Sequence, residues 1–267
     1  MSTGKRRQIQ NRLESITRKW WFLLLFALLF FIPSYSAKPF DPRESAQLVA
    51  EVIPHAPIYS YPAVWPLFKV LPILLVLAII LWGDRATRAF TIYAAVTLLL
   101  MAVLGNMAMT ERYGFAVITG NVVVYFLVAL FWAWEAVVKE TDMSTRPRPG
   151  WRYWVVPLAF LAFWFPVNIE TVRPDWNPLL ILTSEAGLAL CMMIPVYLAI
   201  VTLYYPRINR ATVRVTGLAG MITGLLNVVM WLIVNRETMW WMGVLHLPQL
   251  SISIYALVIS LRRAAQD

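Results

Sequence analysis

The sequence has few of the side chains from which proteins build metal and nucleophilic centres. It contains one cysteine, Cys191, and two histidines, His55 and His246, among 267 residues. A single cysteine excludes an intrachain disulfide and any zinc or iron–sulfur site built from several cysteines. Two histidines exclude a multi-histidine metal centre within one chain. We therefore predict no metal site and no cofactor.

Short motifs that bind nucleotides or mark common hydrolases are also missing. The sequence has neither a Gly-x-x-x-x-Gly-Lys-[Ser/Thr] phosphate loop nor a Gly-x-Gly-x-x-Gly turn. The patterns His-Glu-x-x-His and Gly-x-Ser-x-Gly are absent as well. No local pattern indicates catalysis, so an enzyme is not the favoured interpretation.

Charged residues are scarce, at 14% of the chain, while 60% of the residues are hydrophobic and the mean hydropathy is +0.65. Soluble domains carry about a quarter charged residues, so this chain cannot cover a globule with a polar surface. Its remaining apolar surface must face lipid. The net charge of +9 is explained by basic cytoplasmic segments rather than by nucleic acid as a partner. The composition predicts an all-α integral membrane protein whose partner is the lipid bilayer.

Eight apolar segments approach the roughly 20 residues that a helix needs to cross a bilayer. With the N-terminus in the cytoplasm, 17 of the 23 lysines and arginines fall on the cytoplasmic side. This bias predicts eight transmembrane helices in the plasma membrane, with both termini cytoplasmic. The expected spans are residues 20–37, 64–83, 89–109, 114–134, 153–169, 179–205, 215–234 and 238–261.

The two halves of the chain share an order of landmarks. Pro72 lies ten residues before Trp82, and Pro195 lies ten residues before Tyr205. Four spans per half is an even number, which predicts a tandem 4+4 parallel repeat about an axis near the membrane normal. The expected parts are a basic cytoplasmic segment (1–18), a first membrane half (19–134), a cytoplasmic linker (135–151) and a second membrane half (152–267).

Polar side chains within the expected spans gather in the outer, non-cytoplasmic half, whereas the inner halves offer mainly hydroxyl groups. Glu185 is the one acidic residue well inside a span, and Lys69 is its expected partner because an unpaired charge is costly there. We predict a polar pocket that is open to the outer side. Its candidate residues are Glu185, Lys69, Asn121, Asn227, His246, Gln249, Asn106 and Asn168. For each asparagine and glutamine, a hydrogen bond between helices is the alternative role.

Three functions fit this pattern. The favoured one is binding or transport of a small solute, which the repeat, the prolines within spans and the polar outer half support. A structural or assembly subunit, with other membrane subunits as partners, would use the same polar groups as packing contacts. An enzyme or cofactor-binding subunit acting on a lipid or quinone-like substrate would use Glu185, His246 and Lys69 as acid–base groups.

Overall fold

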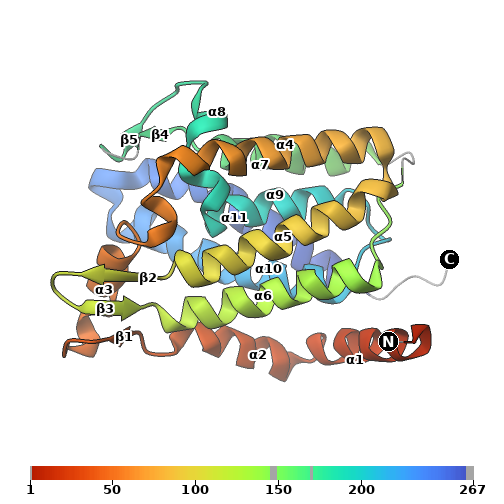
Figure 1. Ribbon diagram of the computed structural model, residues 1–267, viewed down its shortest axis with the longest axis horizontal. Coiled ribbons are helices and arrows are strands. Elements are labelled where there is room, and N and C mark those ends of the chain that lie inside the picture. The colour runs from red at the N-terminus through yellow and green to blue at the C-terminus, as the bar shows by residue number, and fades with distance from the viewer. Residues whose placement is uncertain (1, 145–148, 169–170, 263–267) are drawn as a thin grey trace.

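The computed structural model describes residues 2–144, 149–168 and 171–262. The described chain is mostly helical, and its longer helices lie side by side in one bundle (Figure 1). The α-helices are α1 (Thr3–Thr17), α2 (Trp20–Leu28), α3 (Ser45–Val52), α4 (Trp65–Trp82), α5 (Asp84–Leu104), α6 (Thr119–Val138), α7 (Val155–Trp164), α8 (Leu180–Thr183), α9 (Leu190–Thr202), α10 (Arg210–Val229) and α11 (Arg236–Leu261).

Short elements connect these helices. The 3₁₀ helices are η1 (Leu29–Phe31), η2 (Pro42–Glu44), η3 (Pro57–Tyr59), η4 (Pro62–Val64), η5 (Gly150–Trp154) and η6 (Glu185–Leu188), and η7 (Met230–Val234) is a π-helix. The strands are β1 (Tyr35–Ser36), β2 (Met107–Thr110), β3 (Gly114–Val117), β4 (Val167–Asn168) and β5 (Arg173–Pro174).

Five helical segments of the described chain are long and apolar enough to cross a membrane. They are Pro62–Trp82, Asp84–Leu104, Thr119–Val138, Arg210–Val234 and Arg236–Leu261. A sixth crossing results if Leu180–Leu188 and Leu190–Thr202, which meet at 100°, form one broken span. Large apolar side chains such as Leu74, Ile80 and Leu81 are exposed on these helices, as expected of a surface that faces lipid. The helices therefore support a multi-pass membrane protein.

The eight predicted spans are not all found as long helices. Trp20–Phe31 is apolar but short, and α7 has only ten residues, against roughly 20 for a full crossing. Residues 179–205 do not form one helix, because the backbone is extended at Ser184 and Ala189. The eight-span count and the tandem repeat remain predictions.

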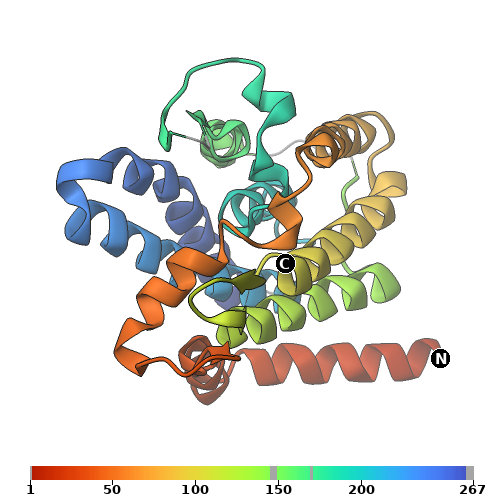
Figure 2. The ribbon, with the colours of Figure 1, turned by 60° about the vertical axis from the view of Figure 1, so that its left-hand side comes forward.

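The prediction of an all-α protein is also wrong in part, because one end of the bundle carries strands. Residues predicted as the ends of two spans form the antiparallel hairpin β2–β3, and β1 pairs with the other edge of β3. Gly114, with φ +66°, takes the left-handed conformation at the start of β3. Ala108 and Ala116 face each other across the hairpin and pack in one cluster with Leu48 and Val52 of α3. Figure 2 brings this end of the bundle forward.

Helices α10 and α11 pack at close range through glycines of α10. A Cβ on Gly217 would lie 3.1 Å from the carbonyl oxygen of Ser253, and a Cβ on Gly224 would lie 3.1 Å from the Cα of Leu250. Small residues let the backbones of membrane helices approach in this way. The two helices form one wall of the bundle, and α9 packs against both of them.

Candidate functional site

The break between α8 and α9 places a short 3₁₀ helix, η6, against α4. Pro72 of α4 has no N–H, so the Phe68 carbonyl one turn earlier lacks its usual helical donor. The Tyr93 hydroxyl donates to that carbonyl instead, at 3.3 Å. Gly187 of η6 lies beside the same group, since a Cβ at this position would be 2.5 Å from the Phe68 oxygen. The proline and the glycine together bring the break into contact with α4.

This contact leads to a testable effect on stability. Gly187→Ala places a methyl group against the backbone of Phe68, which cannot turn away as a side chain can. We expect the free energy of unfolding to fall by about 1–3 kcal/mol, as for other overpacked positions. Thermal unfolding of the purified protein in detergent measures the change. Gly4→Ala is the control, since no atom lies within 4 Å of a Cβ there, and an unchanged melting temperature for Gly187→Ala would contradict the close approach.

Lys69 of α4 is fully buried next to this break. Its ammonium group donates to the carbonyl oxygen of Phe163 in α7 and lies 4.1 Å from the centroid of the Phe163 ring. The carbonyl and the ring face are both attractive to a cation. Lys69 therefore links α4 to α7 while its charge stays without a contacting carboxylate, because the described residues show no ion pair of Lys69.

Glu185, the first residue of η6, is half-buried and close enough to Lys69 for the two charges to attract each other. The predicted partnership is thus a nearby pair rather than a direct contact. Tyr59 of η3 and Cys191 of α9 also lie within electrostatic range of Glu185. Burial raises the pKa of the Tyr59 phenol well above its usual range, and the neighbouring Cys191 and Glu185 raise it further. Tyr59 consequently stays neutral beside the pair.

Asn106 and Asn121 form a pair of their own between α5 and α6. The Asn121 amide donates to Asn106 Oδ1 at 2.9 Å, and the Asn106 amide donates to the carbonyl of Met101 at 2.8 Å. Asn106 is buried, and its carbonyl accepts the N–H of Ile118 at 2.8 Å. These bonds close the turn around the β2–β3 hairpin and match the alternative of a contact between helices.

Three further predicted residues lie on α10 and α11. The Gln249 amide donates to Thr223 Oγ1 at 2.6 Å, and the Asn227 amide donates to the Thr223 carbonyl at 2.9 Å. His246 Nδ1 contacts the carbonyl of Met242, one turn earlier, at 2.6 Å. Gln249 and His246 are buried. The bond between Gln249 and Thr223 joins α11 to α10, whereas the bonds of Asn227 and His246 stay within their own helices.

Asn168 lies at the end of β4, where its Oδ1 accepts the N–H of Thr171 at 3.0 Å. The predicted pocket residues thus fall into several groups of contacts, and the charged pair Lys69–Glu185 is the group at the broken helix.

The sequence interpretation missed a buried polar network at the opposite end of the bundle, where mainly hydroxyl groups were expected. Glu135 of α6 is 2% exposed. Its carboxylate accepts the N–H of Thr141 at 2.8 Å and the amide of Asn209 at 2.7 Å. Asn209 in turn accepts from Gln10 at 3.1 Å, which ties α1 to the bundle. Asn209 could have been recognised as the N-cap of α10, where its side chain accepts from Thr212.

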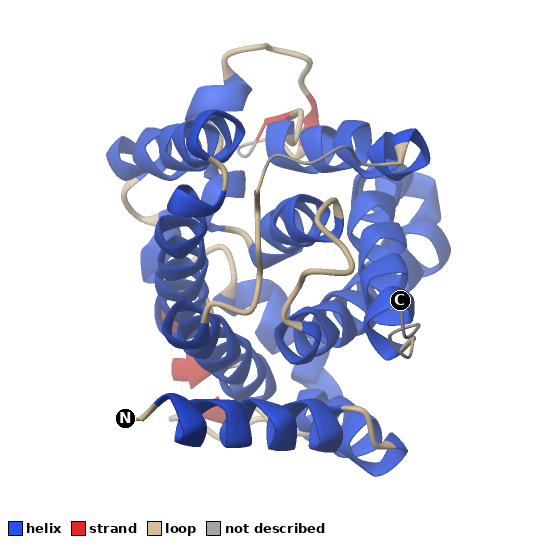
Figure 3. Cartoon of the chain, turned by 90° about the vertical axis from the view of Figure 1, so that its right-hand side faces the viewer, coloured by secondary structure: helices blue, strands red, loops and turns tan. Residues whose placement is uncertain are grey.

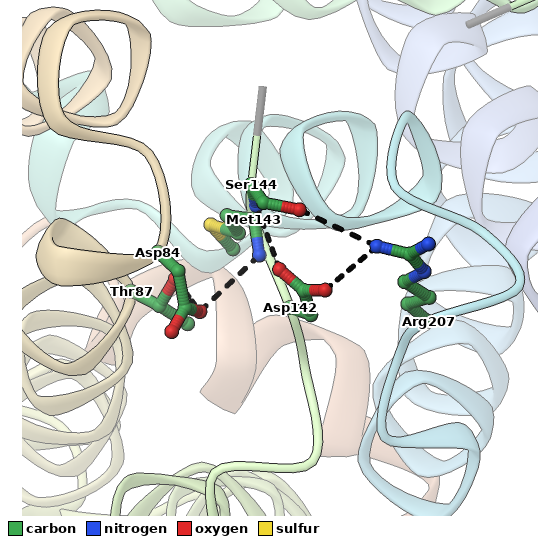
Figure 4. Close-up of polar contacts among 6 residues, drawn as sticks. All are labelled: Asp84, Thr87, Asp142, Met143, Ser144 and Arg207. Carbon is green, nitrogen blue, oxygen red and sulfur yellow. Dashed lines mark hydrogen bonds and ion pairs between the residues drawn. The ribbon is translucent and has the colours of Figure 1, made fainter. Parts of the chain in front are cut away.

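The segment predicted to link two halves of the chain begins at this end, after α6 reaches Val138. Asp142 accepts from Arg207 at 2.8 Å and from the N–H of Ser144 at 2.8 Å. The N–H of Met143 donates to Asp84 at the start of α5, at 3.4 Å (Figure 4). Figure 3 views the bundle from this end, with α1 along its edge. Residues 145–148 of the predicted linker lie outside the described residues.

The linker contacts predict a pH-dependent local opening. The hydrogen bonds from Ser144, followed by the charge of Arg207, hold the pKa of Asp142 below its usual range. A carboxyl group whose pKa is lowered by folding stabilises the folded state at pH values above its ordinary pKa. This stabilisation is lost as the pH falls through the lowered pKa. Asp142→Asn should therefore raise amide hydrogen exchange of residues 142–144 at neutral pH. Asp175→Asn, directly after β5, is the control. Unchanged exchange in Asp142→Asn would contradict the docking of residues 142–144 onto Arg207 and Asp84.

Comparison with protein-family models, with curated proteins and with solved structures gives no match. The described residues contain no group of three or more His, Cys, Asp and Glu side chains that could hold a metal ion. The site is therefore interpreted from its geometry and charge.

Proposed function

We propose that this protein crosses the plasma membrane eight times, with both termini in the cytoplasm, and binds or transports a small polar solute at the Lys69–Glu185 site. The observation that carries this proposal is a buried lysine beside a half-buried glutamate at a broken helix. Ionisable side chains are rare within a bilayer and commonly mark solute pathways. Broken helices occur in membranes where they line a cavity or lie buried in protein, and they form many transporter sites.

The two charges suit a polar ligand because neither one satisfies the other by direct contact. A solute with a donor and an acceptor could lie between the carboxylate of Glu185 and the ammonium of Lys69. Tyr59, which lies within electrostatic range of Glu185, offers a neutral hydroxyl. The sheets and the longest loop lie at this end of the bundle, which the distribution of basic residues assigns to the outside.

Eight crossings are compatible with the short helix α7. The 3₁₀ helix η5 runs directly into α7, and together they cover residues 150–164. Such a segment is about 25 Å long, which approaches the thickness of the hydrocarbon layer. The repeat is supported by the equivalent helices α4 and α9, which carry Pro72 and Pro195 inside them. Each is followed by a closely packed pair, α5–α6 and α10–α11.

A solute screen tests the proposed function. The purified protein is heated in detergent with single amino acids, small carboxylates, amines and sugars, and a rise in melting temperature marks binding. We expect any solute of this site to lose its effect in Glu185→Gln and to keep it in Glu51→Gln, a matched change outside the spans. A solute that stabilises Glu185→Gln as well as the native protein would contradict the site. If no solute acts and Glu185→Gln is silent, the assembly-subunit alternative is favoured.

A further inference from the structure

A cavity lies at the opposite end of the bundle from Lys69 and Glu185. It has a volume of about 410 Å³ and lies between α1, the start of α10 and the end of α11. Its lining contains four arginines, Arg18, Arg210, Arg214 and Arg262, and one glutamate, Glu14. Three neutral polar residues complete it. The lining therefore carries a net charge of +3.

Arg214 is the buried member of this set, at 2% exposure. Its guanidinium donates to Thr17 Oγ1 at 2.7 Å, to the backbone carbonyl of Ser260 at 2.5 Å and to the backbone carbonyl of Glu14 at 3.2 Å, while Nε has no partner. All three acceptors are neutral. Among the described residues, none of the four arginines forms an ion pair, and the carboxylate of Glu14 accepts from Gln10 at 3.4 Å. Glu14 lies within electrostatic range of Arg214, but so do Arg18 and Arg210, so positive charge exceeds negative charge around this buried guanidinium. Such an arrangement is costly.

The positions of the arginines on α10 increase this cost. Arg210 and Arg214 are four residues apart, so they project from the same face of the helix, where like charges destabilise it. Arg210 is also the first residue of α10, at the positive end of the helix dipole. An anion between the two side chains would be attracted both by the paired arginines and by the positive end of the helix dipole, so it would offset both repulsions.

We propose that this cavity binds a phosphate group, with Arg210, Arg214 and Arg18 as its donors. The planar guanidinium matches the geometry of phosphate oxygens and binds them through two parallel hydrogen bonds. The cavity lies at the ends of two membrane helices, where basic pockets bind the headgroups of anionic lipids. The phosphate belongs either to such a headgroup or to free phosphate. The Lys69–Glu185 site is not involved, so the two proposals fail independently.

The test measures the melting temperature of the purified full chain in a nonionic detergent. Phosphatidylglycerol, phosphatidylcholine and inorganic phosphate are titrated separately. The variant Arg18→Gln/Arg210→Gln removes two side chains of the cavity that are not fully buried, so the core stays intact. Arg43→Gln/Arg236→Gln removes two exposed arginines at the other end of the bundle and has the same change in net charge.

We expect phosphatidylglycerol to raise the melting temperature of the native protein at a concentration where phosphatidylcholine does not. The cavity variant should need about tenfold more lipid, which corresponds to the loss of one charge-assisted hydrogen bond. The control variant should respond like the native protein. An equal response to inorganic phosphate would assign the site to free phosphate, and no response to it would assign the site to the lipid headgroup. The proposal is overturned if the cavity variant responds like the native protein. It is also overturned if neither phosphatidylglycerol nor inorganic phosphate raises the melting temperature.

Discussion

Glu135→Ala is expected to lower the free energy of unfolding by about 2–5 kcal/mol. The carboxylate of Glu135 accepts from the N–H of Thr141 and from the amide of Asn209, and Glu135 and Asn209 are both at most 2% exposed. Alanine leaves the buried N–H of Thr141 without an acceptor, leaves the Asn209 amide only its long contact with Gln10 Oε1 at 3.4 Å, and opens a small cavity. Asn209 also caps α10 and contacts Gln10, so the loss spreads to α1 and to the start of α10.

Thermal unfolding in detergent measures this effect. Glu135→Gln keeps the shape and one acceptor, so it should cost less than half as much as alanine. Glu140→Ala changes an exposed glutamate five residues later in the chain and should leave the melting temperature unchanged. If Glu135→Ala unfolds at the native temperature, the network is not what holds the linker and α1 to the bundle.

The second large effect concerns the charges at the broken helix. Lys69→Met and Glu185→Gln each leave one ionisable group in a low-dielectric setting without its opposite charge. We expect each single change to cost about 2–4 kcal/mol, and the double change to cost clearly less than the sum. The coupling between the two positions should be about 1–3 kcal/mol.

Four proteins are needed: the native chain, the two single variants and the double variant. Their unfolding in detergent gives the coupling as the difference between the summed and combined effects. Lys69→Met combined with Glu135→Gln is the control, since Lys69 and Glu135 lie at different ends of the bundle and their effects should add. Additive effects for Lys69 and Glu185 would show that the two charges do not interact.

Composition was sufficient to predict the membrane class, because a chain with 14% charged residues has no polar surface to offer water. The proximity of Lys69 and Glu185 also followed from the cost of an isolated charge. Hydrophobicity alone could not separate helix from strand at residues 107–117, since Met107, Ala108 and Phe115 are as apolar as a span. Pairing with Tyr35 and packing on α3, both distant in sequence, decide that region.

The inner network was missed for a related reason. Gln10 and Asn209 lie in polar segments that look solvated, and Glu135 follows directly after an apolar run. Their burial depends on α1 folding back onto α6 and α10, a contact between residues about 200 positions apart in the chain. Local sequence patterns carry no information about such a contact. The break at Ser184 and Gly187 had a local signal, in that small residues interrupt an otherwise apolar run.

The most direct test of the proposed site is a cysteine-accessibility scan from the outer side of the membrane. Cys191 is first replaced with serine, and single cysteines at positions 106, 121, 185, 227 and 249 are treated with a membrane-impermeant thiol reagent. We predict labelling at 185, which is half-buried at the broken helix, and none at 249, which is fully buried between α10 and α11. Absence of labelling at 185, while cysteines at the loop positions 44 and 173 react, would show that the broken helix is dry. That result would contradict a solute site at Lys69 and Glu185.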